Sequence, residues 1–202
     1  MTGEELASLR ALVASTRELM LAVGTTDLAD DELDRLRAEV DSLTAKIGAV
    51  RRTHVVRAGF EAPGAAKVAG EVWHAFANNP FATPLELTYE GDTARATFVA
   101  NALHEGPADC LHGGLAAHLM DCVLGTMMQA SGRRSRTGTL DVRYLRPTPL
   151  NQPLELFGEI TSSSGRRHLT RGTISHNREV TVEAKGLFVE IAPQRAQEDA
   201  PR

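Results

Sequence analysis

The first fifty residues carry two stretches in which apolar side chains recur every three or four positions. One runs from Leu6 to Val23 and the other from Leu33 to Val50, with a break at residues 24–27. This spacing places the apolar side chains along one narrow seam of an α-helix. The pattern predicts a helical hairpin, which serves either as an oligomerisation or packing element or as a lid over an active site.

The sequence also suggests how the second helix begins. Asp27 or Asp30 can cap it, and the acidic run Asp30-Asp31-Glu32 suits its positive N-terminal end. Residues 53–84 contain several turn-forming prolines and glycines and predict an irregular connector, with a short helix around Glu71 to Phe76.

Beyond this connector the pattern changes to alternation of apolar and polar positions, which is typical of β-strands. Two such segments, PLELTYEG and DTARATFVA, meet at Gly91-Asp92. Four more follow residue 136: TGTLDVRYLRP, PLELFGEITS, RHLTRGTISH and EVTVEAKGLFVEI. Because turn residues such as Ser163-Ser164-Gly165 and Asn177-Arg178 join successive segments, the sequence predicts an antiparallel sheet of about six strands.

Between the two groups of strands lies CLHGGLAAHLMDCVLG, residues 110–125, a His-Gly-Gly turn followed by an almost wholly apolar helix. A helix with apolar side chains on all sides needs cover on all sides. One helix among six strands predicts an α+β fold in which a curved antiparallel sheet wraps around the central helix, the hotdog fold. Asp121 is a carboxylate in the middle of this helix, and burying a carboxylate is costly unless it is paired or used.

Composition and charge limit the possible functions. The chain has 202 residues, of which 42% are hydrophobic and 4% aromatic, enough for one sizeable core but not two. Its net charge of -4 argues against a nucleic-acid-binding protein. No apolar run is long enough to span a membrane and MTGEELASLR does not resemble a signal peptide, so we expect a cytoplasmic protein. Cys110 and Cys122 form no disulfide framework and are weak candidates for a nucleophile.

The motif HGG, followed by Asp121 and then by TGTLDVRYLRPTPL, resembles the PaaI-like branch of the hotdog-fold acyl-CoA thioesterases. The resemblance covers roughly residues 85–191. It implies a thioester hydrolase that releases a free acid and coenzyme A from acyl-CoA. Many members of this family carry an Asn six residues before the His, where this chain has Gly106.

Thioester hydrolysis needs an activated water or a nucleophile, together with hydrogen-bond donors for the oxygen that becomes negative. The helix N-terminus at the HGG turn offers such donors, and we assign this role to the backbone N–H of Gly113, with Gly114 allowing close approach of substrate. Asp121 would act as general base or as nucleophile. The resemblance implies that Thr137 orients the water or binds Asp121. His112 shapes the turn or holds the thioester, with a catalytic base as the second interpretation.

Gly113 and Asp121 are eight residues apart, which corresponds to ~12 Å along a helix. One thioester cannot contact both, so the spacing predicts active sites shared between two chains, in a homodimer or a dimer of dimers. Coenzyme A would enter as part of the substrate, with no further cofactor, and no cluster of residues has the spacing of a metal site. The phosphates of coenzyme A need cationic side chains to bind them. The candidate phosphate-binding residues are Arg133, Arg134, Arg136, Arg166 and Arg167.

These patterns divide the chain into a helical hairpin at 1–52, a hotdog domain at 53–192 and a polar tail at 193–202 that we expect to be disordered. Two other functions remain open. A hotdog hydratase or dehydratase would pair a catalytic His, here His112, with a carboxylate across the dimer. A non-catalytic acyl-CoA-binding module would use the same surface without turnover.

Overall fold

The computed structural model describes residues 3–191, so the tail at 193–202 lies outside the described residues. Two compact units make up the described chain. The first contains the residues up to Arg57 together with Ala77–Ala82, and the second contains Ala58–Phe76 together with the chain from Thr83 onward.

The first unit contains the two helices that the apolar seams predict, α1 (Gly3–Thr25) and α2 (Asp30–Gly48). The predicted side-chain cap of α2 is wrong, because Ala29 occupies the N-cap position and makes no such hydrogen bond. Asp30 instead begins the first turn of the helix, where its charge still suits the positive end of the helix dipole.

Arginine side chains attach the segment Ala77–Ala82 to α1. The guanidinium of Arg17 donates to the carbonyl oxygens of Asn79 at 2.6 Å and Ala82 at 3.2 Å, and Arg10 donates to the Asn78 side chain at 3.2 Å. In contrast, α2 has no buried residue.

The connector is more regular than its sequence predicts. It contains a helix, α3 (Ala62–Ala69), with Pro63 in its first turn and Gly70 at its C-terminus in a left-handed conformation, φ 67°. The predicted short helix around Glu71 to Phe76 is wrong. Residues Trp73–Ala75 form β1, which extends the sheet by pairing with Leu85–Leu87. Because Gly70 ends the preceding helix, the chain can turn to the open edge of the sheet.

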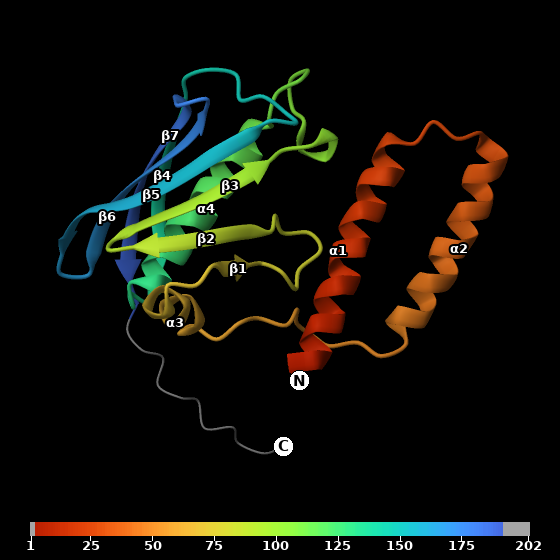
Figure 1. Cartoon of the computed structure of the whole chain (residues 1–202), viewed down its shortest axis with the longest axis horizontal. Coiled ribbons are helices and arrows are strands. Elements are labelled where there is room, and N and C mark those ends of the chain that lie inside the picture. The colour runs from red at the N-terminus through yellow and green to blue at the C-terminus, as the bar shows by residue number, and fades with distance from the viewer. Residues whose placement is uncertain (1–2, 192–202) are drawn as a thin grey trace, which may run out of the picture. The chain divides into compact units, whose positions relative to one another are not determined.

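The second unit is a seven-stranded antiparallel sheet with one long helix, so the predicted hotdog fold is confirmed. The strands lie in the order β1-β2-β3-β5-β6-β7-β4 (Figure 1). The remaining elements are β2 (Leu85–Glu90), β3 (Thr93–Val99), the 3-10 helix η1 (Ala102–His104), α4 (Gly113–Ala130), β4 (Ser135–Tyr144), β5 (Pro153–Ser164), β6 (Arg167–His176) and β7 (Glu179–Glu190). Three of the predicted turns contain residues with positive φ, at Gly91, Gly165 and Asn177-Arg178.

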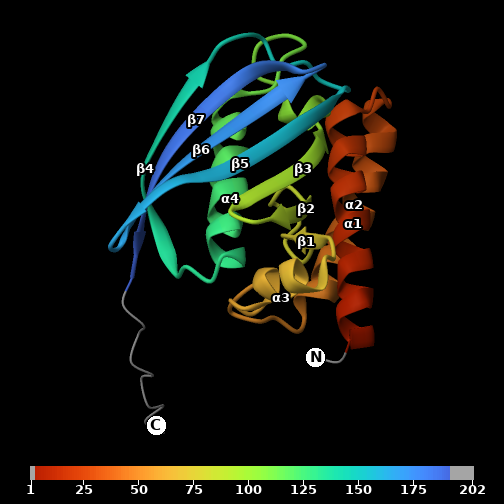
Figure 2. The same ribbon diagram turned by 60° about the vertical axis from the view of Figure 1, so that its left-hand side comes forward.

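The sheet curves around α4, and Figure 2 shows β4 to β7 arching over the helix. Leu119, Met120, Val123 and Leu124 of α4 are fully buried. The helix packs closely because glycines occupy the strands beneath it. A Cβ atom at Gly158 would lie 3.0 Å from Leu124 and 3.2 Å from Val123.

Among residues 3–191, no helix is long and apolar enough to cross a membrane.

We expect Gly158→Val to lower the free energy of unfolding by about 1–3 kcal/mol, because the added side chain would overpack the contact between α4 and β5. Urea denaturation followed by circular dichroism measures this loss. Gly59→Val is the matched control, since a Cβ atom at Gly59 has no neighbour within 4 Å. Equal stability of the two variants would show that α4 does not depend on the glycine beneath it.

Candidate active site around the central helix

The His-Gly-Gly turn forms the N-terminus of α4, with His112 as the N-cap residue. The backbone N–H of Gly114 donates to Nδ1 of His112 at 2.9 Å. This hydrogen bond satisfies one of the free donors that begin every helix and occupies the lone pair of Nδ1. The backbone N–H of Gly113 has no acceptor among residues 3–191. The turn therefore presents one unused N–H, that of Gly113, at the positive end of the helix dipole.

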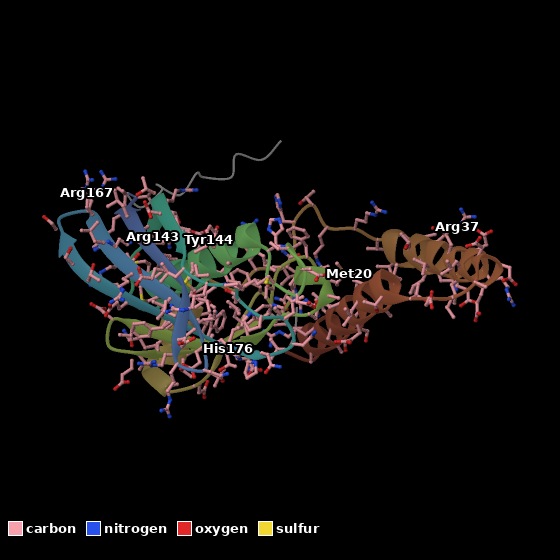
Figure 3. The ribbon with its side chains drawn as sticks, turned by 90° about the horizontal axis from the view of Figure 1, so that it is seen from above. Met20, Arg37, Arg143, Tyr144, Arg167 and His176 are labelled. Atoms are coloured by element: carbon pink, nitrogen blue, oxygen red, sulfur yellow. The ribbon has the colours of Figure 1, made fainter. Side chains whose placement is uncertain are left out.

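Tyr144, at the end of β4, holds the same turn from the other side. Its hydroxyl group donates to the carbonyl oxygen of Gly113 at 2.9 Å. A Cβ atom at Gly113 would lie 3.3 Å from the Tyr144 ring, so glycine permits this close approach. Figure 3 labels Tyr144 beside Arg143 on β4. In the sequence Tyr144 is part of the family motif TGTLDVRYLRPTPL, but no local pattern indicates its contact with Gly113.

The glycine that departs from the family pattern has a steric explanation. A Cβ atom at Gly106 would lie only 2.8 Å from Cα of His112, a distance that would force the backbone to move. The backbone N–H of His112 donates to His104 at 2.8 Å, which holds the two segments together. No side chain fits at position 106 in this arrangement, so the contact that the family Asn makes has no counterpart at this position.

The carboxylate of Asp121 lies within reach of β4. The hydroxyl group of Thr137 donates to Oδ1 of Asp121 at 2.7 Å, which brings together two of the predicted site residues. A β-bulge interrupts the pairing of β4 with β7 between Thr137 and Thr139, leaving Gly138 without a partner. Bulges change the direction of neighbouring side chains.

One strip of α4 is not covered within the described chain. His118 is exposed, and Asp121, Cys122, Gly125 and Gln129 are only partly buried. These positions recur every three or four residues and therefore share one side of the helix. The expectation that α4 is buried on all sides is thus wrong for a single chain, because the sheet covers one side only. Asp121 lies at the edge of the exposed strip and is partly exposed.

Cys122 is next to Asp121, but its thiol group is poorly suited to act as a nucleophile. Burial, with a smaller contribution from the negative charge of Asp121, raises the pKa of Cys122 to about 12. Its Sγ atom lies 3.6 Å from Nε2 of His118, one helical turn away. A thiol with so high a pKa stays protonated at neutral pH, and only the thiolate is a strong nucleophile.

Several of the predicted phosphate-binding arginines have partners within the chain. Arg133 forms a salt bridge with Asp92 at 3.2 Å, and the guanidinium of Arg134 lies 4.3 Å from the centre of the Phe60 ring. Arg166 is also engaged, because two of its nitrogens donate to the carbonyl oxygen of Glu190 at 2.9 and 2.6 Å. These contacts were not predictable, since each joins segments that are distant in the sequence.

The other two arginines of the predicted set are not engaged in this way. Arg136 and Arg167 have no side-chain partner among residues 3–191, and both are exposed. The backbone of each is paired with Val189 of β7, Arg136 from β4 on one side and Arg167 from β6 on the other. They therefore lie two strands apart on the same face of the sheet, at a separation of roughly 10 Å between backbones.

A buried hydrogen-bonded group lies on the same inner face of the sheet as Thr137. His168 is 3% exposed, and its two ring nitrogens lie 2.8 Å from the Ser163 hydroxyl and 2.9 Å from the Glu190 carboxylate. His168 and Thr137 both pair with Phe188, one on each side. The three hydrogen-bonded residues come from three strands, so no local pattern in the sequence indicates them. Both nitrogens of His168 have partners, which accounts for its burial.

One hollow of the described surface lies away from these residues. It has a volume of about 710 Å³ and opens on the face of the sheet opposite α4, with Thr88, Arg95, Glu155 and Phe157 among its lining residues. Arg95 lies 4.7 Å from the centre of the Phe157 ring. None of the predicted site residues lines this hollow.

Within residues 3–191, no three His, Cys, Asp or Glu side chains are grouped closely enough to hold a metal ion.

Comparison with known proteins places this geometry in context. No protein-family model matches the chain. A crystal structure of a thioesterase superfamily protein is similar to it with a TM-score of 0.77 and 28% sequence identity, covering 90% of this chain and 94% of that one. Because the match covers so much of the chain, it includes residues of both compact units.

Two more distant structures share the fold of the second unit. The E. coli PaaI protein from the phenylacetic acid degradation operon has a TM-score of 0.51 and 14% identity, covering 54% of this chain and 80% of its own. A Streptococcus mutans protein bound to acetyl CoA has a TM-score of 0.52 and 16% identity, covering 55% of this chain and 91% of its own.

The high pKa of Cys122 predicts slow reaction with iodoacetamide at pH 8. With a pKa of about 12, the thiolate is only about one part in ten thousand of the group at that pH. Mass spectrometry of the Cys110→Ala variant would follow the labelling of Cys122 alone, with the urea-unfolded variant as the control. We expect labelling at least a hundredfold slower in the folded protein. Equal rates would show that Cys122 is neither buried nor influenced by Asp121.

Proposed function

We propose that this chain, which has the hotdog fold and is 28% identical to a thioesterase superfamily protein of known structure, hydrolyses the thioester bond of acyl-CoA. The observation that carries this proposal is the Asp121 carboxylate, which lies on the uncovered strip of α4 and accepts a hydrogen bond from Thr137 at 2.7 Å. One carboxylate oxygen is held in place by this bond, while the other has no hydrogen-bond partner among residues 3–191 and would act on a substrate.

Two mechanisms use this arrangement. As a general base, Asp121 removes a proton from a water molecule whose oxygen attacks the thioester carbon. The carbon–sulfur bond then breaks, and the leaving sulfur takes up a proton to give the free thiol of coenzyme A. As a nucleophile, Asp121 attacks the carbon itself, the carbon–sulfur bond breaks, and the thiolate of coenzyme A leaves and takes up a proton. Water then hydrolyses the mixed anhydride to the free acid and restores the Asp121 carboxylate. Thr137 positions the carboxylate in both mechanisms.

The oxyanion formed by either attack needs a donor, and the Gly113 N–H is the free donor of the turn. It has no acceptor within residues 3–191 and lies at the helix N-terminus. The N–H of Gly114 is bonded to His112 and is therefore not a further oxyanion donor, so Gly114 keeps only the role of allowing close approach of substrate. His112 in turn orders the turn as N-cap residue, and Tyr144 fixes the Gly113 carbonyl group.

The proposed site requires two copies of the chain. Gly113 and Asp121 are both in α4, eight residues and therefore ~12 Å apart along its axis. We propose a homodimer, alone or paired into a dimer of dimers, in which Gly113 of one copy faces Asp121 and Thr137 of the other. Two features of the single chain support this assembly. The strip of α4 beside Asp121 is uncovered, and β4 is an edge strand with one side unpaired.

Coenzyme A would bind at the β4 edge of this interface, with its phosphates near Arg136 and Arg167 on the face of the sheet opposite α4. These two arginines are exposed and have no partner within the described chain, unlike Arg133, Arg134 and Arg166. A Streptococcus pneumoniae hypothetical thioesterase with coenzyme A also shares the fold, at a TM-score of 0.51 and 17% identity. That structure supports coenzyme A as the ligand class.

The alternative functions are less well supported. A hydratase or dehydratase would use His112 as a base, but Nδ1 of His112 already accepts the Gly114 N–H, which leaves only Nε2 for chemistry. A non-catalytic binding module needs no ordered carboxylate. Release of free thiol from a panel of acyl-CoA substrates, from short to long and including aromatic acyl groups, distinguishes the hydrolase from both. A binder gives no release, and a hydratase acts on an enoyl-CoA.

We predict that Asp121→Asn keeps the fold and lowers kcat for acyl-CoA hydrolysis by a hundredfold or more, the usual scale for a positioned general base. Asn retains the shape and the hydrogen bond from Thr137 but can neither accept the proton nor attack. Thiol release and the melting temperature are measured together. Asp141→Asn, at an exposed aspartate of β4, is the control and should retain full activity. Normal turnover of the Asp121→Asn variant would remove Asp121 from the mechanism.

A second prediction tests whether the site is shared. Gly113→Pro removes the proposed oxyanion N–H at the first helical residue, where proline is tolerated. His112 already has the extended backbone, φ −60° and ψ 128°, that a residue before proline prefers. The proline ring would press on Tyr144, whose side chain is 56% exposed and can turn outward. This variant and Asp121→Asn should each be inactive alone.

Co-refolded in equal amounts, the two variants should recover about 25% of wild-type activity. Half of the randomly formed dimers are mixed, and each mixed dimer has one intact site of two. Melting temperatures and proof of subunit exchange are the controls. If exchange occurs between folded variants and no activity returns, Gly113 and Asp121 do not come from different chains.

A further inference from the structure

The second helix presents an apolar seam that nothing in the described chain covers. Its members are exposed to between 37% and 51%: Leu33, Leu36, Val40, Leu43 and Ile47. No residue of α2 is buried. Single exposed apolar residues are common on protein surfaces, but a continuous row of five along one helix indicates a contact with a partner.

The spacing of this seam identifies the kind of partner. Steps of three, four, three and four residues are the heptad pattern by which two helices pack side by side with interlocking side chains. The helix has 19 residues and is therefore about 28 Å long. A second helix of similar length and apolar pattern would cover the seam completely.

Charges beside the seam identify the partner more closely. Glu39 and Lys46 each lie one position before a seam residue, Val40 and Ile47, and have no ion-pair partner among residues 3–191. The other two basic residues of α2 are already paired, Arg35 with Asp31 and Arg37 with Asp34. Figure 3 labels Arg37 on this helix. An unpaired acid and an unpaired base thus flank the same seam, seven residues apart.

We propose that the seam of α2 binds the same seam of a second copy of this chain, with the two helices antiparallel. In this register Leu36 packs against the second copy's Ile47, and Val40 packs against its Leu43. Glu39 then faces the second copy's Lys46, and the two-fold symmetry repeats this ion pair. The antiparallel direction also keeps the acidic start of α2, Asp30-Asp31-Glu32, apart from the acidic start of its partner.

Other occupants fit this surface less well. Parallel pairing would set the acidic starts of both helices side by side, where like charges repel. An anionic membrane would be repelled by the same acidic residues, which outnumber the basic ones on α2. The seam is short for an independent coiled coil, so its pairing strengthens an assembly that already holds two copies together. The pairing itself does not depend on the proposed hydrolase activity.

Disulfide crosslinking of the full-length chain tests the proposal. Two single-cysteine variants, Leu36→Cys and Ile47→Cys, are co-expressed in a Cys110→Ala/Cys122→Ala background and oxidised. We expect a covalent dimer that contains one copy of each variant and accounts for up to about half of the protein, since half of the random pairs are mixed. Each variant expressed alone should stay monomeric on a non-reducing gel.

The matched control is the pair Ala38→Cys and Ala45→Cys, which lies at the same level of the proposed dimer but on the opposite side of α2. This pair should give at least about tenfold less covalent dimer, because its cysteines face away from the partner. Three outcomes would overturn the proposal: equal crosslinking by both pairs, crosslinking of Leu36→Cys with itself, which indicates parallel helices, and binding to phosphatidylserine vesicles without crosslinking.

A charge exchange tests the register independently. Adding Glu39→Lys to both crosslinking variants places two lysines opposite each other at both ends of the pair, so we expect about two- to tenfold less covalent dimer. Adding Lys46→Glu as well restores the opposite charges and should restore the yield. A further loss with the double exchange would overturn the antiparallel register.

Discussion

The close contact of α4 with the sheet governs the rest of the second unit. Glycines at 158 and 172 leave room for the side chains of Met120, Val123 and Leu124 to lie directly on the strands. This contact buries one side of the helix in the only sizeable core of the described chain. The contact also determines where an active site can lie. Because one side of α4 packs tightly on the sheet, only the opposite side is available to solvent, substrate and a second copy of the chain.

The site residues follow from this arrangement. The sheet curves around the helix far enough for its last strand, β4, to contact α4 at two places. Thr137 binds the carboxylate in the middle of the helix, and Tyr144 binds the turn at its start. The proposed base and the proposed oxyanion donor are therefore positioned by the same strand, although they belong to different active sites in the proposed dimer.

The sequence predicts the elements of the fold well because each has a strong periodicity or an evident turn. It predicts the contact between Asp121 and Thr137 through the resemblance to a known family. The features it did not predict depend on long-range contacts. Trp73–Ala75 is a strand only because the edge of β2 is free to pair with it. Arg133 and Arg134 are engaged only because Asp92 and Phe60 are close in space. The open strip of α4 depends on how far the sheet extends, which no local pattern encodes.

The bulge at Gly138 determines which way Thr137 points. Successive side chains of a strand alternate between its faces, so residues an odd number of positions apart point in opposite directions. Thr137 and Tyr144 are separated by seven positions, yet both contact the central helix. The unpaired Gly138 takes one position out of the alternation. Because of this extra glycine, the side chains of Thr137 and Tyr144 point to the same face of β4, and one strand contacts both the middle and the N-terminus of α4.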